Sequence, residues 1–253
     1  MRLRCGTREA ACRLVIFDKD GTLIDFASLW VPVVRARARF IVEEAGADGA
    51  LEPALLRAFG YDPDTGRVDP RGPLAIAPRS ETTVIAATLL YGAGVPWEDA
   101  MAAVRRAYRR ADEAVDPTRA ARAVPGVAPA LRRLRDAGLR LGVATTDTTA
   151  HARRGLAALA LADLFDAILG ADAVNRTKPD PELVHRLCAE VGVPPGEAVV
   201  VGDAVGDLLM GRAAGAALVV GILTGVAGEA ELRAHADVVV ASLGELVPLA
   251  EGP

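Results

Sequence analysis

The chain alternates between short apolar runs and longer stretches in which apolar residues recur with helical spacing. The consecutive apolar residues 14–17 include β-branched and aromatic side chains and predict a buried strand. Further apolar runs follow in the C-terminal half, separated by stretches with helical spacing. The expected strands are 139–144, 165–169, 198–202, 217–222 and 237–240, and the expected helices are 128–137, 149–159, 181–191, 205–214 and 229–234. This alternation predicts βαβ units and a parallel sheet.

Residues 28–121 show a different pattern, because helical spacing continues through them and no strand is expected. Helices are predicted over 28–46, 52–59, 80–91 and 95–113. The loop 60–73, rich in Gly, Pro and Asp, is expected to be too loosely built to give a tight, long-lived seal, with ordering on closure as the alternative. The pattern therefore predicts an all-helical domain, 28–121, inserted into an α/β core domain made of 13–27 and 122–253. Residues 1–12 are expected to be a flexible lead-in.

Composition narrows the class of protein. The chain has 253 residues, 51% of them hydrophobic, which is enough to bury a full core. Its net charge is −4 without a long block of like charge, so nucleic-acid binding has no electrostatic support. Cys5, Cys12 and Cys188 lack a metal-ligand spacing and suit a reducing cytoplasm. No apolar run approaches the roughly 20 residues of a membrane helix, and the polar start does not fit a signal peptide, so a cytoplasmic protein without a membrane partner is expected.

Lysine is rare in this chain. Of 29 lysines and arginines, only Lys19 and Lys178 are lysines. Because ammonium and guanidinium groups differ in size and hydrogen-bonding geometry, the positions that keep lysine are candidates for a specific role. Lys178 precedes a proline and a predicted helix. Lys19 lies between two aspartates, and we expect its side chain to point away from both and to have no catalytic role.

Polar side chains follow the strands where a parallel sheet would bring them together. Asp18 and Asp20 come directly after the first strand, and residues i and i+2 of an extended chain point the same way, so both carboxylates can face one substrate. Thr145 follows the strand 139–144, and Asp203 and Asp207 follow the strand 198–202. Ligands of α/β proteins bind beyond the carboxyl ends of the strands. The sequence therefore predicts a polar site at this edge of the sheet.

These residues also form a recognisable set of motifs. The set consists of the stretch Asp-Lys-Asp-Gly-Thr-Leu at 18–23, the hydroxyl of Thr145, the pair Lys178-Pro179 and the segment from Gly202 to Asp207. In order and spacing, these four resemble the four motifs of the haloacid dehalogenase (HAD) superfamily. The resemblance covers the core, and the helical insertion falls where that family places its C1-type cap. It implies a Rossmann-like parallel sheet with a helical cap and an activity like that of phosphoglycolate phosphatases.

The resemblance also implies roles for the carboxylates. Asp18 would be the nucleophile that becomes an aspartyl-phosphate, and Asp20 the general acid and then the general base. Asp18, the backbone carbonyl of Asp20 and Asp203 would hold Mg²⁺, and Asp207 would order a metal-bound water. Such a cation is needed because an anionic nucleophile must approach an anionic phosphate.

The remaining motifs imply phosphate contacts. Thr145 would bind a phosphate oxygen, and Lys178 would lie between nucleophile and phosphate, where a compact ammonium fits better than a guanidinium. The family often has Asn after the hydroxyl residue, and Thr146 stands there instead, which puts the second phosphate contact in doubt. Simpler explanations stay open, because Asp203 and Thr145 resemble helix caps and Asp207 resembles an ordinary acid in a first helical turn.

The presence of Asp20 favours one activity within the family. Haloalkanoate dehalogenases lack a carboxylate at this position and the ATPases tend to have Thr there, so the resemblance favours Mg²⁺-dependent hydrolysis of a small phosphorylated metabolite. A phosphosugar mutase of the β-phosphoglucomutase type, or a non-catalytic binding module on the same fold, are the alternatives. Either a monomer or a homodimer is expected. Arg67, Arg71 and Arg79 are candidates for contact with a second anionic group of the substrate. The three histidines, His151, His185 and His235, are expected to be surface or packing residues without an acid partner.

Overall fold

The computed structural model of the chain describes residues 1–249. The chain divides into two compact units, one formed by Met1–Asp25 and the segment from Ala121 onward, the other by Phe26–Ala120. In the part described, no helix is both long and apolar enough to cross a membrane.

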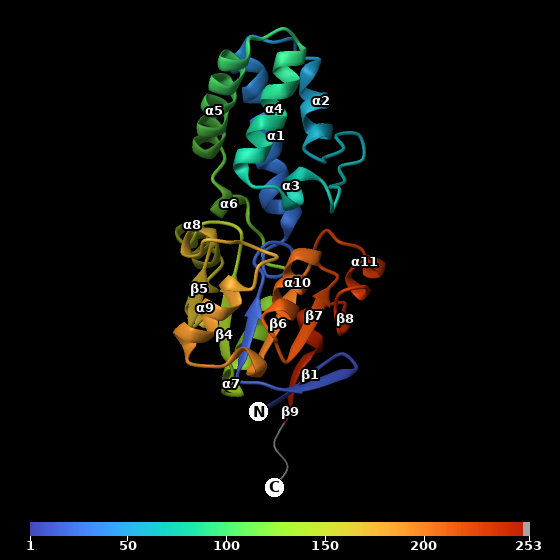
Figure 1. Ribbon diagram of the computed structural model, residues 1–253, viewed down its shortest axis with the longest axis vertical. Coiled ribbons are helices and arrows are strands. Elements are labelled where there is room, and N and C mark those ends of the chain that lie inside the picture. Colours follow the sequence, from blue (N-terminus) through green and yellow to red (C-terminus); the bar gives the residue numbers. More distant parts are fainter. Residues whose placement is uncertain (250–253) are drawn as a thin grey trace. The chain divides into compact units, whose positions relative to one another are not determined.

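The first unit is built on a six-stranded parallel sheet with the strand order β5-β4-β3-β6-β7-β8 (Figure 1). The strands are β3 (Leu14–Phe17), β4 (Arg140–Ala144), β5 (Ala167–Leu169), β6 (Ala198–Gly202), β7 (Leu218–Ile222) and β8 (Val238–Val240). Each lies within two residues of a strand predicted from the sequence. The expected fold class, a Rossmann-like α/β core with a helical insertion, is confirmed.

Helices cover both faces of this sheet. They are α7 (Val127–Asp136), α8 (Thr149–Ala158), α9 (Glu182–Val191), α10 (Val205–Ala213) and α11 (Glu229–Arg233). All four residues of β3 are fully buried, since side chains on alternate faces are covered from both sides. On one face, Leu14 and Ile16 pack with Leu183 and Leu187 of α9. Burial of this central strand fixes its register, and with it the position of the residues that follow.

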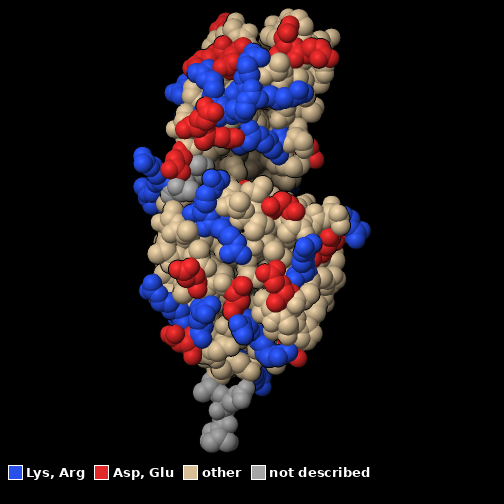
Figure 2. All heavy atoms as spheres, turned by 90° about the vertical axis from the view of Figure 1, so that its left-hand side faces the viewer, with Lys and Arg blue, Asp and Glu red and all other residues tan. Residues whose placement is uncertain are grey.

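The second unit is all-helical among its described residues. It contains α1 (Phe26–Ala45), α2 (Leu51–Ala58), α3 (Pro73–Ile76), α4 (Arg79–Gly92), α5 (Trp97–Ala114) and α6 (Pro117–Ala120). The buried residues of α5 recur at helical spacing and include Val104 and Tyr108, so one face of this helix packs inward. Its opposite face carries arginines that pair with acids of α1, such as Arg106 with Glu44 at 2.7 Å. Basic and acidic side chains are interspersed on the face shown in Figure 2.

The loop 60–73 is better ordered than the sequence suggests. The Asp62 amide donates to the Arg67 carbonyl at 2.9 Å, and the Asp69 amide donates to the Gly60 carbonyl at 2.7 Å. The Tyr61 hydroxyl accepts a hydrogen bond from Arg35 of α1 at 2.7 Å. The loop is therefore held by hydrogen bonds of its own turns rather than loosely built, while the expectation that it does not seal an active site for long stays a prediction.

Residues 1–12 also differ from expectation, since they form an ordered hairpin rather than a flexible lead-in. The strand β1 (Arg2–Cys5) pairs antiparallel with β2 (Arg8–Ala11) on one side and with β9 (Leu246–Leu249) on the other. Leu3 and Cys5 are fully buried and alternate with exposed arginines, a strand pattern with period two. The pairing joins the two ends of the sequence, so neither segment alone indicates its partner.

Candidate active site

Three of the predicted site residues lie at the carboxyl edge of the central strands. Phe17 of β3 pairs in register with Val143 of β4 and Val201 of β6, so Asp18, Thr145 and Asp203 follow at nearly the same level. The Asp18 amide continues the ladder by donating to the carbonyl of Val201 at 2.9 Å. The structure thus brings together polar residues more than a hundred positions apart, as the parallel sheet predicts.

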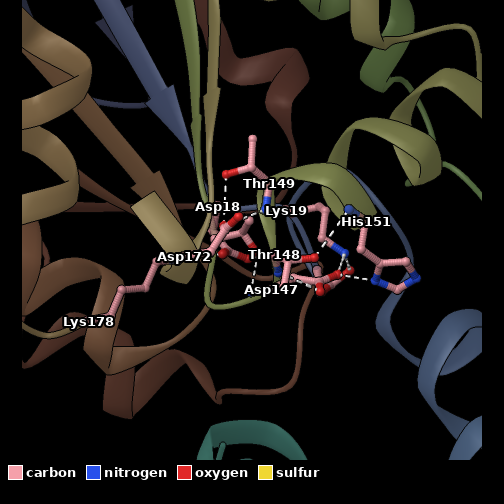
Figure 3. Close-up of polar contacts among 10 residues, drawn as sticks. Asp18, Lys19, Asp147, Thr148, Thr149, His151, Asp172 and Lys178 are labelled. Carbon is pink, nitrogen blue, oxygen red and sulfur yellow. Dashed lines mark hydrogen bonds and ion pairs between the residues drawn. The ribbon is translucent and has the colours of Figure 1, made fainter. Parts of the chain in front are cut away.

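Lys178 reaches this edge from the loop before α9. Its ammonium lies 2.5 Å from Asp18 Oδ1 and 2.5 Å from Asp207 Oδ1, and only 6% of its side chain is exposed (Figure 3). Burial alone would lower the pKa of Lys178, but the two carboxylates outweigh it and raise the pKa above its ordinary value. Lys178 is therefore a fixed positive charge beside Asp18.

The acidic residues are crowded. Burial, followed by the charges of Asp207 and Asp20, raises the pKa of Asp18 to about 7 although Lys178 opposes the shift. Burial and the charges of Asp18 and Asp207 also raise the pKa of Asp203 well above its ordinary value. Such a cluster needs more positive charge than Lys178 supplies in order to ionise fully.

A divalent cation would fit this cluster. Asp18, Asp203 and Asp207 each offer a carboxylate oxygen, and these oxygens all lie within 4.8 Å of one another. An all-oxygen donor set suits a hard cation such as Mg²⁺. Among the described residues, the side chain of Asp20 is not part of this group. The cluster of Asp18, Asp203 and Asp207 can therefore bind a metal.

The two threonines after β4 differ in their surroundings. Thr145 is 1% exposed, and its hydroxyl accepts a hydrogen bond from the Asp147 amide at 3.2 Å. Thr146 is exposed. The N-cap of α8 is Thr148, whose hydroxyl accepts from the His151 amide at 3.3 Å. The threonine-rich stretch therefore does cap α8, through Thr148, and Thr145 is not itself the cap.

Lys19 does not point away from Asp20, contrary to the prediction. Its ammonium lies 2.8 Å from Asp20 Oδ1 and 3.2 Å from Asp147 Oδ2, and 1% of its side chain is exposed. The prediction failed because strand alternation ends at Phe17. The chain then turns, with the Leu23 and Ile24 amides both donating to the Lys19 carbonyl at 2.9 Å.

His151 also has an acid partner, contrary to the prediction. Its Nδ1 lies 2.5 Å from Asp147 Oδ2, four residues earlier in the chain (Figure 3). The i, i+4 spacing across the start of α8 was a usable signal. The expectation that no histidine has an acid partner is therefore wrong for His151.

Similarity to known proteins shows which family the chain belongs to. The chain matches the family model "haloacid dehalogenase-like hydrolase" over residues 12–215, which is most of its length. This chain belongs to the haloacid dehalogenase-like hydrolases. The resemblance drawn from its four motifs is confirmed, and the helical insertion between β3 and β4 is consistent with a C1-type cap.

Relatives of this hydrolase span nearly its whole length. "Probable phosphatase IndB" of Dickeya dadantii is 30% identical over 239 residues, covering 92% of this chain and 91% of the relative. A "Phosphoglycolate phosphatase" of Yersinia pseudotuberculosis is 28% identical over 239 residues, covering 94% and 93%. The crystal structure of a "predicted phosphoglycolate phosphatase" from Haemophilus somnus has a TM-score of 0.70 at 21% identity, covering 92% of this chain and 96% of that one, which shows a shared fold.

The loop after β7 contributes to the site of this hydrolase and was missed from the sequence. The Val226 amide donates to Asp203 Oδ2 at 3.3 Å, and the Thr224 hydroxyl donates to the Gly21 carbonyl at 2.7 Å. On the other side, the Thr22 hydroxyl donates to Asp203 Oδ1 at 3.1 Å. The Gly-rich stretch 224–228 after a strand was a weak signal of such a close approach.

Gly225 is required by this close approach. A Cβ atom there would lie 1.8 Å from Asp203 Oδ2, whereas a Cβ at Gly228 would meet nothing within 4 Å. Gly225→Ala is therefore expected to displace Asp203 and weaken divalent-cation binding by roughly 10–100-fold. Gly228→Ala is the matched control and is expected to bind Mg²⁺ as the wild type does. Isothermal titration with Mg²⁺ measures both; unchanged affinity in Gly225→Ala would show that Asp203 is not a ligand.

Proposed function

We propose that this hydrolase is a Mg²⁺-dependent phosphatase that cleaves a small phosphate monoester through an aspartyl-phosphate on Asp18. One observation carries the proposal: Asp18 lies at the end of the central strand, paired with the Lys178 ammonium and grouped with Asp203 and Asp207. Two relatives that span the chain, quoted above, are named as phosphatases. Geometry and relatives together favour a phosphate ester as the substrate.

Asp18 and Lys178 would perform the first step. A carboxylate oxygen of Asp18 attacks phosphorus, the ester bond to the leaving oxygen breaks, and that oxygen takes a proton from Asp20. Lys178 orients Asp18 through its contact with Oδ1 and favours its ionised form, and a bound cation would supply the further positive charge that the cluster needs. The buried Thr145 hydroxyl, near the N-terminal end of α8, would donate to a phosphate oxygen, with Thr146 as a further candidate contact.

Asp20 would then act in the opposite direction. It takes a proton from water as that water attacks the phosphorus of the aspartyl-phosphate, which releases inorganic phosphate and restores Asp18. Asp20 ends this step protonated, ready for the next substrate, so protons balance over the cycle.

A bound Mg²⁺ would neutralise negative charge on the phosphate and on the acidic cluster. Asp18, Asp203 and the backbone carbonyl of Asp20 would hold it. Both oxygens of Asp207 already have protein partners, since Oδ1 contacts Lys178 and Oδ2 accepts from the Ala204 amide at 3.1 Å. Asp207 holds Lys178 through Oδ1, and beside a bound metal it would order a water, which is the role that the family resemblance implies.

The substrate class rests on the relatives. The Yersinia pseudotuberculosis protein is named for phosphoglycolate, so we infer a small phosphorylated metabolite of comparable size. Arg67, Arg71 and Arg79 of the insertion stay candidates for a second anionic group. Arg79 is already paired with Asp112 at 2.6 Å, which leaves it a weaker candidate than the sequence suggests.

Phosphate release across a panel of phosphorylated metabolites tests the proposal. We expect free phosphate as the product with Mg²⁺ present. A hexose 1-phosphate should be followed by NMR with a trace of the 1,6-bisphosphate. Stoichiometric conversion to the 6-phosphate with little free phosphate would identify a mutase instead.

Chelation tests the role of the metal. Hydrolysis of p-nitrophenyl phosphate is expected to fall to background in excess EDTA and to recover when Mg²⁺ is restored, because the crowded carboxylates repel a phosphate without a cation between them. Absorbance of p-nitrophenolate measures the rate. Full activity in excess chelator would show that hydrolysis does not need a bound metal.

A further inference from the structure

Lys19 is a buried charge at the active edge with no place in the reaction as described. Its ammonium contacts Asp20 and Asp147, and its side chain is 1% exposed. A buried ammonium is costly unless carboxylates surround it. Because it is covered, Lys19 cannot touch a substrate, so any influence on the reaction must pass through the residues that it contacts.

Asp20 is the contact that matters for chemistry. Lys19 Nζ holds Asp20 Oδ1 at 2.8 Å, and the Asp20 side chain is 15% exposed, in contrast to Lys19. With one oxygen held, the other oxygen of Asp20 is the one left to exchange a proton. Proton transfer in the transition state requires the acid to be in place, and an error of about 1 Å can cost roughly a hundredfold in rate.

Asp147 holds Lys19 in turn. Its Oδ2 contacts the Lys19 ammonium and His151 Nδ1, and its Oδ1 accepts from the Thr148 amide at 2.7 Å. Its own amide donates to the Thr145 hydroxyl at 3.2 Å. Burial would raise the pKa of Asp147, but His151 and Lys19 outweigh it and lower the pKa, so Asp147 is a stable anion in this network.

We propose that Lys19, held by Asp147 and His151, is the positioning residue that fixes the carboxylate of Asp20 for proton transfer to the leaving group. The inference rests on the proposed phosphatase function. The network joins the loop after β3 to the start of α8, because Asp147 contacts Lys19 through its carboxylate and the Thr145 hydroxyl through its amide. Figure 3 shows Lys19, Asp147 and His151 together.

The test uses two esters of similar size, benzyl phosphate and p-nitrophenyl phosphate, with the full chain and Mg²⁺. The benzyl alcohol oxygen needs a proton as it leaves, whereas p-nitrophenolate leaves readily without one. Lys19→Met fills the buried space but removes the contact. It is expected to lower kcat/KM roughly 10–100-fold for benzyl phosphate and less than about threefold for p-nitrophenyl phosphate. Because kcat/KM covers only the steps through transfer to Asp18, the later role of Asp20 as base does not enter.

Asp147→Asn is a second variant in case Lys19→Met does not fold. Both oxygens of Asp147 accept hydrogen bonds, so an Asn amide would face a donor in either orientation. We expect Asp147→Asn, like Lys19→Met, to lower kcat/KM more for benzyl phosphate than for p-nitrophenyl phosphate, but by a smaller factor. Asp172→Asn is the matched control, since Asp172 binds the Thr149 amide and hydroxyl at the same helix end but makes no contact with Lys19 or Asp20 that the structure records. Asp172→Asn should change kcat/KM for neither ester by more than about twofold.

The double variant Lys19→Met/Asp20→Asn separates positioning from general destabilisation. If Lys19 acts through Asp20, adding Lys19→Met to Asp20→Asn should lower kcat/KM for benzyl phosphate by less than about twofold. Equal losses for both esters in Lys19→Met, or additive losses in the double variant, would overturn the inference and leave the phosphatase function standing. If the wild-type protein releases phosphate from neither ester, both the inference about Lys19 and the proposed phosphatase function are overturned.

Discussion

Asp18→Asn is expected to abolish turnover while leaving the fold intact. The amide is nearly isosteric with the carboxylate but is not a nucleophile, so kcat should fall by at least about 10⁴-fold. Asp18 is one of three crowded acids whose oxygens lie within 4.8 Å, and removing one charge relieves repulsion in the metal-free protein. The thermal midpoint without metal should therefore not fall below that of the wild type.

Phosphate release and thermal unfolding measure these two effects separately. Asp172→Asn serves again as the control, because it makes the same chemical change at an exposed position beside the site. Residual activity of Asp18→Asn above about a hundredth of the wild type would mean that another group attacks phosphorus.

Asp20→Asn is expected to have the second largest effect. An amide cannot give or take the proton, so both half-reactions slow, by roughly the 10²–10⁴-fold of general acid–base catalysis. The fall in kcat/KM should be greater for benzyl phosphate than for p-nitrophenyl phosphate, whereas the fall in kcat should extend to both because water attack also needs the base. Steady-state kinetics on both esters measures this pattern. A uniform change in KM with kcat preserved would instead assign Asp20 to substrate binding.

The arrangement of strand ends could be predicted because it follows from local patterns. A four-residue apolar run such as Leu14–Phe17 is short and fully buried, so its end is well defined, and parallel strands bring their carboxyl ends to one edge. Asp18, Thr145 and Asp203 were therefore placed correctly from the sequence. Lys178 comes from a loop, and its motif rather than a periodicity indicated it.

The rest depended on contacts that no local pattern encodes. The direction of Lys19 was predicted from strand alternation, which stops where the chain turns after Phe17. Gly225 is needed only because Asp203, 22 positions earlier, comes within contact distance. The strands β1 and β9 pair across almost the whole chain length, and each is too short to be convincing alone.

The most direct test of the account is to trap the covalent intermediate. The wild-type enzyme is mixed with substrate and Mg²⁺, quenched in acid, treated with borohydride to reduce any acyl phosphate to an alcohol, and mapped by peptide mass spectrometry. The account predicts homoserine in place of Asp18, absent from Asp18→Asn and from samples without substrate. Reduction at any other carboxylate, or a phosphorylated residue elsewhere, would contradict it.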